Sequence, residues 1–177
     1  MSVVSVLTEE HVLLLRFVGY LGWDEPEGAE TPKRVRGDLL AFFCALDRHE
    51  EFEETIFGGP AGEAGVLGRL TGVLSEEHRR LAGIRVEILE ILRSARENTS
   101  PRLKPLVERL AAHLHAHFAW EEKSLWPRRP PSHSVDEEVD LENRARADLL
   151  LLSAEVASCG IHLADSAGRG PEVRDSR

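Results

Sequence analysis

The sequence LTEEH at residues 7–11 returns as LSEEH at residues 74–78, so that a histidine recurs after 67 residues. The sequence HEEFEE at residues 49–54 returns as HFAWEE at residues 117–122, in which the histidine and the last two glutamates recur after 68 residues. Offsets that agree this closely indicate that a pair of helices has been duplicated. The duplication repeats residues of the kind that bind metal ions, namely His11, His49, Glu53, His78, His117 and Glu121. Four histidines and two glutamates in matching places predict two metal ions.

The spacing of histidine and glutamate within HEEFEE and HFAWEE suits metal binding. His49 precedes Glu53 by four residues, as His117 precedes Glu121, and residues four apart on a helix lie on the same face. Imidazole suits first-row metals and a carboxylate can bridge two of them, so this mixture favours iron or manganese over a structural zinc site built from thiolates. One such pair is a weak signal on its own, whereas two pairs with two further repeated histidines are a specific one.

Apolar residues recur at helical spacing and predict an all-α fold. The expected helices cover residues 4–20, 32–57, 62–97 and 101–126, with Gly-rich and Pro-rich segments between them. Short connections place consecutive helices next to each other in opposite directions, which predicts an antiparallel four-helix bundle. His11 falls on the apolar stripe of the first helix and is therefore expected to face the core.

The chain is expected to divide into a bundle and a C-terminal extension. The bundle covers residues 1–127, and residues 128–163 hold a linker and a further helix at 135–159. Four consecutive leucines at 149–152 give this helix an apolar side without a metal-binding pattern. It is expected either to pack across the bundle or to form a dimer contact. The polar tail, residues 164–177, is expected to be disordered.

The pattern resembles the hemerythrin-like family, also called the HHE cation-binding domain, whose four helices supply His, His-x-x-x-Glu, His and His-x-x-x-Glu in that order. The resemblance covers about residues 4–127 and includes the sequence EEKSLWP at residues 121–127. Ferritin-like bundles are the nearest alternative, but their signature is Glu-x-x-His with carboxylates in the majority. The resemblance implies two non-heme irons, one held by His11 and His49, the other by His78 and His117, with Glu53 and Glu121 as bridges. An oxo or hydroxo bridge, water or a small exogenous molecule would complete the coordination.

Other titratable residues lie near the six in sequence. His113 stands one turn before His117 and is a candidate additional ligand. Respiratory hemerythrins carry their added histidine on the third helix, where this chain has Leu74, and this departure argues against classical reversible O₂ carriage. Three acidic residues are expected to surround the ions rather than to bind them, namely Glu50, Glu54 and Glu122. Three more histidines are expected to be solvated or structural, namely His115, His133 and His162.

The composition limits the partners. A formal net charge of −9 over 177 residues argues against a nucleic-acid surface and against binding to anionic membranes. No apolar run approaches the length of a membrane span. The chain has two cysteines and no secretory pattern after Met1, so we expect a cytoplasmic protein with reduced thiols, as a monomer or a homodimer. Cys44 is expected to be a small buried side chain.

The expected function is that of a non-heme di-iron protein that binds or transforms a small oxidant such as O₂, H₂O₂ or NO. An enzyme of this kind would decompose peroxide or act in oxidative or nitrosative stress defence. The alternative is a module that binds or senses O₂ or iron without turnover. The sequence leaves open which small molecule is used and whether turnover occurs.

Overall fold

The protein is helical throughout the part described by the computed structural model, which is residues 2–21, 31–57, 65–94, 100–129 and 134–160. These ranges contain no strand, which confirms the predicted all-α class. The α-helices are α1 (Val3–Tyr20), α2 (Thr31–Phe57), α3 (Gly65–Ser94), α4 (Ser100–Trp120) and α5 (Val135–Ser158). After α4 come a π-helical segment, η2 (Glu121–Leu125), and a 3₁₀ segment, η3 (Trp126–Arg128).

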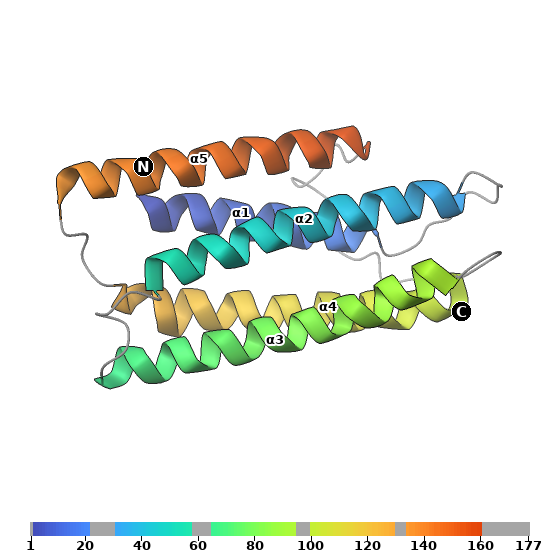
Figure 1. Cartoon of the computed structure of the whole chain (residues 1–177). Helices are drawn as coiled ribbons and strands as arrows, with labels where there is room; N and C mark the ends of the chain where they lie inside the picture. Colours follow the sequence, from blue (N-terminus) through green and yellow to red (C-terminus); the bar gives the residue numbers. More distant parts are fainter. Residues whose placement is uncertain (1, 22–30, 58–64, 95–99, 130–133, 161–177) are drawn as a thin grey trace, which may run out of the picture.

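The five helices lie side by side (Figure 1). The first helix, α1, packs against α2, α4 and α5, while α3 packs against α4 and α2. The last helix, α5, lies along α1 and α2, on the side of the molecule away from α3 and α4 (Figure 1). Within the described residues the two copies of the repeat are therefore covered unequally, because α5 packs along the α1–α2 copy.

Serine side chains cap two of the helices at their N-termini. The hydroxyl of Ser2 accepts a hydrogen bond from the N–H of Ser5 (3.2 Å) at the start of α1. The hydroxyl of Ser134 accepts one from the N–H of Glu137 (3.1 Å) at the start of α5. Each cap satisfies a backbone N–H that has no partner within its own helix. Three acidic residues in the first turn of α5 also suit the positive end of the helix dipole.

The buried apolar side chains form two clusters at different heights of the helices. One cluster includes Leu14, Leu46, Leu81 and Leu114, and the other includes Leu7, Phe52, Leu74 and Leu125. The four predicted histidine ligands lie between these two sets in sequence, one on each of α1 to α4. A band of buried histidine and glutamate is thus enclosed between two apolar layers, which keep water away from it.

The predicted winding of the fourth helix is wrong at its C-terminal end. The sequence predicts one helix through residue 126, but α4 ends at Trp120 and the chain continues as π-helix and then 3₁₀-helix. Pro127 cannot donate a backbone hydrogen bond, so the regular α-helical pattern cannot pass it. The change of winding begins at the predicted ligand Glu121, whose carbonyl accepts from the N–H of Trp126.

The predicted burial of Cys44 is also wrong, because its side chain is exposed. Cys44 shares the outer face of α2 with Leu40 and Asp47, which lie four residues before it and three after it and are both exposed. The expected disordered tail at 164–177 and the histidines at 133 and 162 lie outside the described residues. Within the described ranges, no helix is both long and apolar enough to cross a membrane.

Candidate metal site

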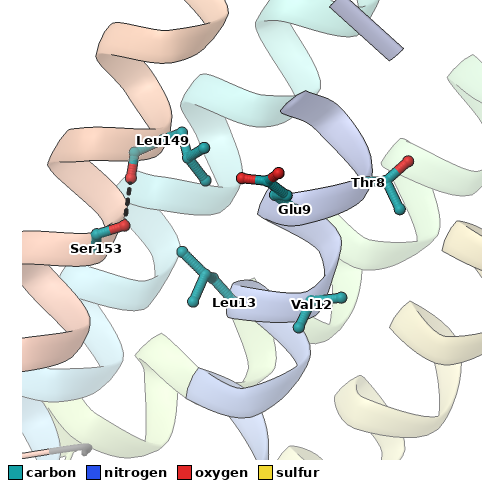
Figure 2. Close-up of a pocket in the computed structure, with 6 residues that line it drawn as sticks. All are labelled: Thr8, Glu9, Val12, Leu13, Leu149 and Ser153. Carbon is teal, nitrogen blue, oxygen red and sulfur yellow. Dashed lines mark hydrogen bonds between the residues drawn. The ribbon is translucent and has the colours of Figure 1, made fainter. Parts of the chain in front are cut away.

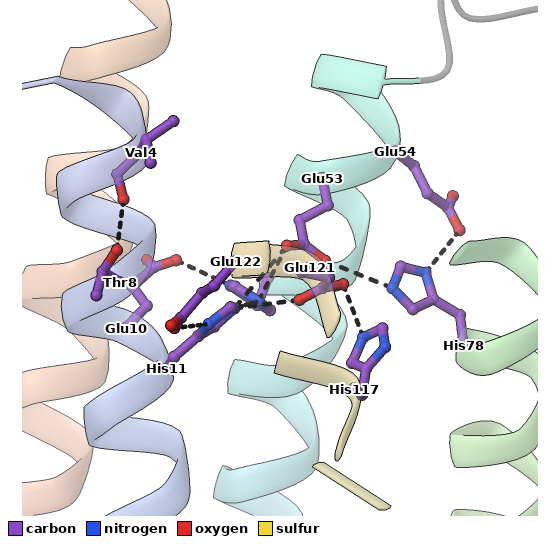
Figure 3. A network of polar contacts seen from close by, with 11 residues as sticks. Val4, Thr8, Glu10, His11, Glu53, Glu54, His78, His117, Glu121 and Glu122 are labelled. Carbon is purple, nitrogen blue, oxygen red and sulfur yellow. Dashed lines mark hydrogen bonds and ion pairs between the residues drawn. The ribbon is translucent and has the colours of Figure 1, made fainter. Parts of the chain in front are cut away.

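The structure brings all six predicted ligands together in the buried band, and Figure 3 labels five of them, all except His49. Each is 6% exposed or less. They form two overlapping groups whose candidate ligand atoms all lie within 4.8 Å of one another, and each group could hold a metal ion. The first group is His11, His49, Glu53 and Glu121, and the second is Glu53, His78, His117 and Glu121. The two glutamates are common to both groups.

In the first group, the histidines of α1 and α2 point their Nε2 atoms at each other. The Nε2 atoms of His11 and His49 are 3.0 Å apart. Oε2 of Glu121 lies 3.3 Å from the first of these nitrogens, and Oε1 of Glu53 lies 3.5 Å from the second. Two ligands bound at right angles to one ion at about 2.1 Å lie about 3 Å apart. The spacing of the nitrogens therefore suits neighbouring ligands of a single ion.

In the second group, the same two carboxylates turn their other oxygens towards α3 and α4. Oε2 of Glu53 lies 3.5 Å from Nε2 of His78, and Oε1 of Glu121 lies 2.9 Å from Nε2 of His117. Each carboxylate thus offers one oxygen to each pair of histidines. A carboxylate shared in this way can bridge two ions.

Many polar atoms at the centre of this cluster have no hydrogen-bond partner among the described residues. They include both carboxylate oxygens of Glu53 and of Glu121, and Nε2 of His78 and His117. Burying a polar group without a partner costs several kcal/mol, about 2–7 depending on the reference state. Cations would satisfy these atoms, because they are lone-pair donors that face one another. The residues present therefore fit metal ions.

Three of the four histidines are held from behind by a glutamate. Nδ1 of His78 donates to Oε1 of Glu54 (3.2 Å), and Nδ1 of His11 donates to Oε1 of Glu122 (3.0 Å). Both glutamates were expected to lie around the centre, and they do so through these bonds (Figure 3). A proton fixed on Nδ1 leaves the lone pair of Nε2 directed into the cluster.

The third supporting glutamate, Glu10, was missed by the sequence analysis. It is buried and accepts a hydrogen bond from Nδ1 of His49 at 3.0 Å. Its signal was present in the repeat, because Glu10 precedes His11 as Glu77 precedes His78. The role of Glu10 could not be predicted from the repeat alone, because its partner His49 is on another helix, α2, at the same level along the bundle.

The remaining candidates lie outside both groups. His113 is half-buried and His115 is exposed on α4, and neither belongs to a described cluster of possible ligands. Glu50 is buried, with one carboxylate oxygen 3.6 Å from the guanidinium of Arg85. The other oxygen of Glu50 has no hydrogen-bond partner among the described residues. Leu74, where an added histidine was considered, is buried in the apolar layer.

The metal-free cluster holds its charges unequally. Burial, together with the neighbouring His49, lowers the pKa of His11 to about 2, and burial lowers the pKa of His117 to about 3. Burial alone would raise the pKa of Glu53, but the nearby histidines, led by His49, outweigh it and lower that pKa to about 2. Burial and the charge of Glu53 raise the pKa of Glu121 well above its usual value. The two shared carboxyls therefore differ in their affinity for a proton, which is weaker than usual at Glu53 and stronger than usual at Glu121.

Aromatic rings enclose the side of the cluster formed by α1. The ring of Phe118 stacks on His11 with centroids 3.8 Å apart and planes 7° from parallel. The ring centroid of Trp126 lies 4.6 Å from that of the His11 imidazole. Trp126 follows directly on the π-helical segment that begins at Glu121. Such segments are rare and occur frequently at functional sites.

A separate groove of about 330 Å³ lies on the outer side of α1, where α5 packs against it (Figure 2). Its lining residues are Thr8, Glu9, Val12, Leu13, Leu149 and Ser153, and none of the six predicted ligands is among them.

In comparisons with known proteins, no family model, curated protein or solved structure matches the chain.

Proposed function

We propose that the chain is a hemerythrin-like four-helix bundle, with α5 as an additional helix, that binds two iron ions and uses them to bind or transform a small oxidant such as O₂, H₂O₂ or NO. The observation that carries the proposal is the division of each bridging carboxylate between two histidine pairs. Oxygens of Glu53 and Glu121 face both pairs at 2.9 to 3.9 Å. A ligand set that mixes nitrogen and oxygen and contains no thiolate favours iron or manganese.

The protein residues would act as ligands and as their supports. His11 and His49 would hold one ion, His78 and His117 the other, and the two glutamates would bridge them. Iron bound there would supply redox chemistry and open coordination positions for a small molecule. Glu10, Glu54 and Glu122 keep three of the imidazoles in the orientation and tautomer that present Nε2 to the ions.

The burial of the site favours a ligand of only a few atoms. All six ligands are nearly or fully inaccessible to solvent, and apolar clusters lie on both sides of them. The described groove on the outer face of α1 does not include them. A dry enclosure of this kind suits a diatomic molecule or a peroxide better than an organic substrate.

Metal content tests the proposal directly. We expect about two irons per chain after anaerobic reconstitution with Fe(II) and removal of unbound metal. The variant His117→Ala should lose iron, because it removes a ligand of the second group. The control His115→Ala changes an exposed histidine on the same helix two residues away and should keep both irons. Zinc in place of iron, or equal loss in both variants, would contradict the proposal.

Turnover separates an enzyme from a binding module. Peroxide is added to the iron-loaded protein, and O₂ release is followed with an electrode, with His117→Ala as the inactive control. Sustained release supports peroxide decomposition. Reversible uptake of O₂ by the ferrous protein, without turnover, supports a carrier or sensor instead. The same ferrous sample exposed to NO shows by its optical spectrum whether NO binds.

A further inference from the structure

The fourth histidine of the cluster lacks the support that the other three have. His11, His49 and His78 each donate from Nδ1 to a glutamate. Nδ1 of His117 is buried and has no hydrogen-bond partner within the described part of the chain. The two histidines of the first group are therefore both anchored, whereas the second group has one anchored histidine and one that is not.

The repeat shows which residue is missing. Glu10 supports His49 from the neighbouring helix α1, and the matching position on α3 is Glu77, which would face His117 by the same relation. Glu77 instead pairs with Arg80 on its own helix at 2.5 Å, and its side chain is 22% exposed. In the first copy, the position of Arg80 is occupied by Leu13, which offers no charge to turn Glu10 outwards.

The two copies also differ in what packs on them. The fifth helix packs along α1 and α2, and its Ala145 is fully buried in the same apolar cluster as Val6 and Phe52. Glu10, on α1, is 3% exposed and turns inwards to His49. The α3–α4 pair lies on the other side of the molecule from α5 (Figure 1). Glu77, on α3, is 22% exposed and pairs with Arg80 instead.

From these contacts we propose that the two metal positions are unequal, and that the position between His78 and His117 binds its ion more weakly, fills last and exchanges first. The inference rests on the proposed di-metal function. Loss of a hydrogen bond behind a metal-binding histidine typically costs 10–100-fold in metal affinity. The second position should therefore bind at least about tenfold more weakly than the first.

Glu50 acts in the opposite direction, but its charge is largely balanced. It is buried on α2 on the side that faces α3, and a carboxylate near the second position would attract a cation there. The guanidinium of Arg85 lies 3.6 Å from one of its oxygens and offsets that charge. In the repeat, the residue that matches Glu50 is Phe118, which stacks on His11 beside the first position. Phe118 carries no charge, so it adds no attraction for a cation there.

The test is an anaerobic titration of the metal-free full chain with Mn(II), in which the EPR signal of free Mn(II) reports the unbound ion. We expect two binding steps whose dissociation constants differ about tenfold or more. The variant His117→Ala should keep the tighter step, whereas His49→Ala should lose it. Glu10→Ala, which removes the acceptor behind His49, should weaken the tighter step about tenfold. The matched control Glu77→Ala, at the same place in the other copy, should leave both steps unchanged.

The outcomes separate this inference from the proposed function. Two ions of equal affinity, or an equal effect of Glu10→Ala and Glu77→Ala, would overturn the inequality and leave the two-metal site intact. A tighter step that survives in His49→Ala but not in His117→Ala would reverse the order. No binding of Mn(II) or Fe(II) at all would overturn the proposed function itself. Circular dichroism of each variant confirms that the helices are retained.

Discussion

Removing the metal should lower the thermal stability of the protein by a large and calculable amount. The unfolded chain has no preformed site, so the free energy of metal binding adds to the free energy of unfolding. One ion at a free concentration of 100 times its dissociation constant contributes about 2.7 kcal/mol. The structure offers two groups of ligands, so two ions at that saturation contribute about 5 kcal/mol.

This free energy converts into a shift of the melting temperature. In domains of roughly 150–250 residues, 1 kcal/mol corresponds to about 2–4 °C. Chelation should therefore lower the melting temperature by roughly 10–20 °C. The helical signal before the transition should be mostly retained, because the apolar layers containing Leu14 and Phe52 do not depend on the ions. In the metal-free protein, the helix packing should loosen first around Glu53 and Glu121, because their buried carboxylates lose their cations.

The assay is thermal unfolding followed by circular dichroism at 222 nm, with and without iron, in an anaerobic cell. His117→Ala should show about half of the shift, because it keeps the position between His11 and His49, whereas His115→Ala, with its exposed side chain, should show all of it. Identical curves for the wild-type protein with and without metal would refute the reasoning. That result would mean that no ion is bound between the apolar layers.

Three further predictions follow from the contacts. Glu53→Ala or Glu121→Ala should lose both irons, because each bridge touches both positions, while His113→Ala should keep them; elemental analysis compares the three. Metal affinity should rise with pH, because the raised pKa of Glu121 means that an ion must displace its proton; calorimetry in buffers of different ionisation enthalpy should detect proton release. Leu152→Ala, which truncates a buried side chain of α5, should cost about 2–5 kcal/mol in chemical denaturation, and the exposed neighbour Leu151→Ala should cost almost nothing.

The sequence predicted the six clustered residues because their positions depend on local spacing. A separation of four residues fixes two side chains on one helical face whatever the rest of the fold does. The matching offsets between copies also predicted equivalent places for His11 and His78, and each belongs to one of the two groups that share Glu53 and Glu121. The helix class and most helix boundaries follow from the same periodicity and from proline and glycine positions. Ligation itself stays a prediction.

The parts that the sequence did not predict depend on contacts between helices. The support of His49 by Glu10 requires α1 and α2 to meet at one height, and within the described residues no matching support reaches Nδ1 of His117. The exposed side of Cys44 was misjudged because its neighbours in sequence are apolar while its neighbours on the helix face are not all so. Local composition was given more weight there than helical phase.

The π-helical segment after α4 has a consequence for how the two copies diverged. In the first copy the buried pair Ile56 and Phe57 begins three residues after Glu53, whereas in the second the pair Leu125 and Trp126 begins four residues after the matching glutamate. A π-helical turn accommodates one residue more than an α-helical turn. The second copy thus behaves as if one residue had been inserted after Glu121. The π-helical turn accommodates this residue, so that the four-residue spacing of histidine and glutamate is kept and the apolar pair after it is still buried.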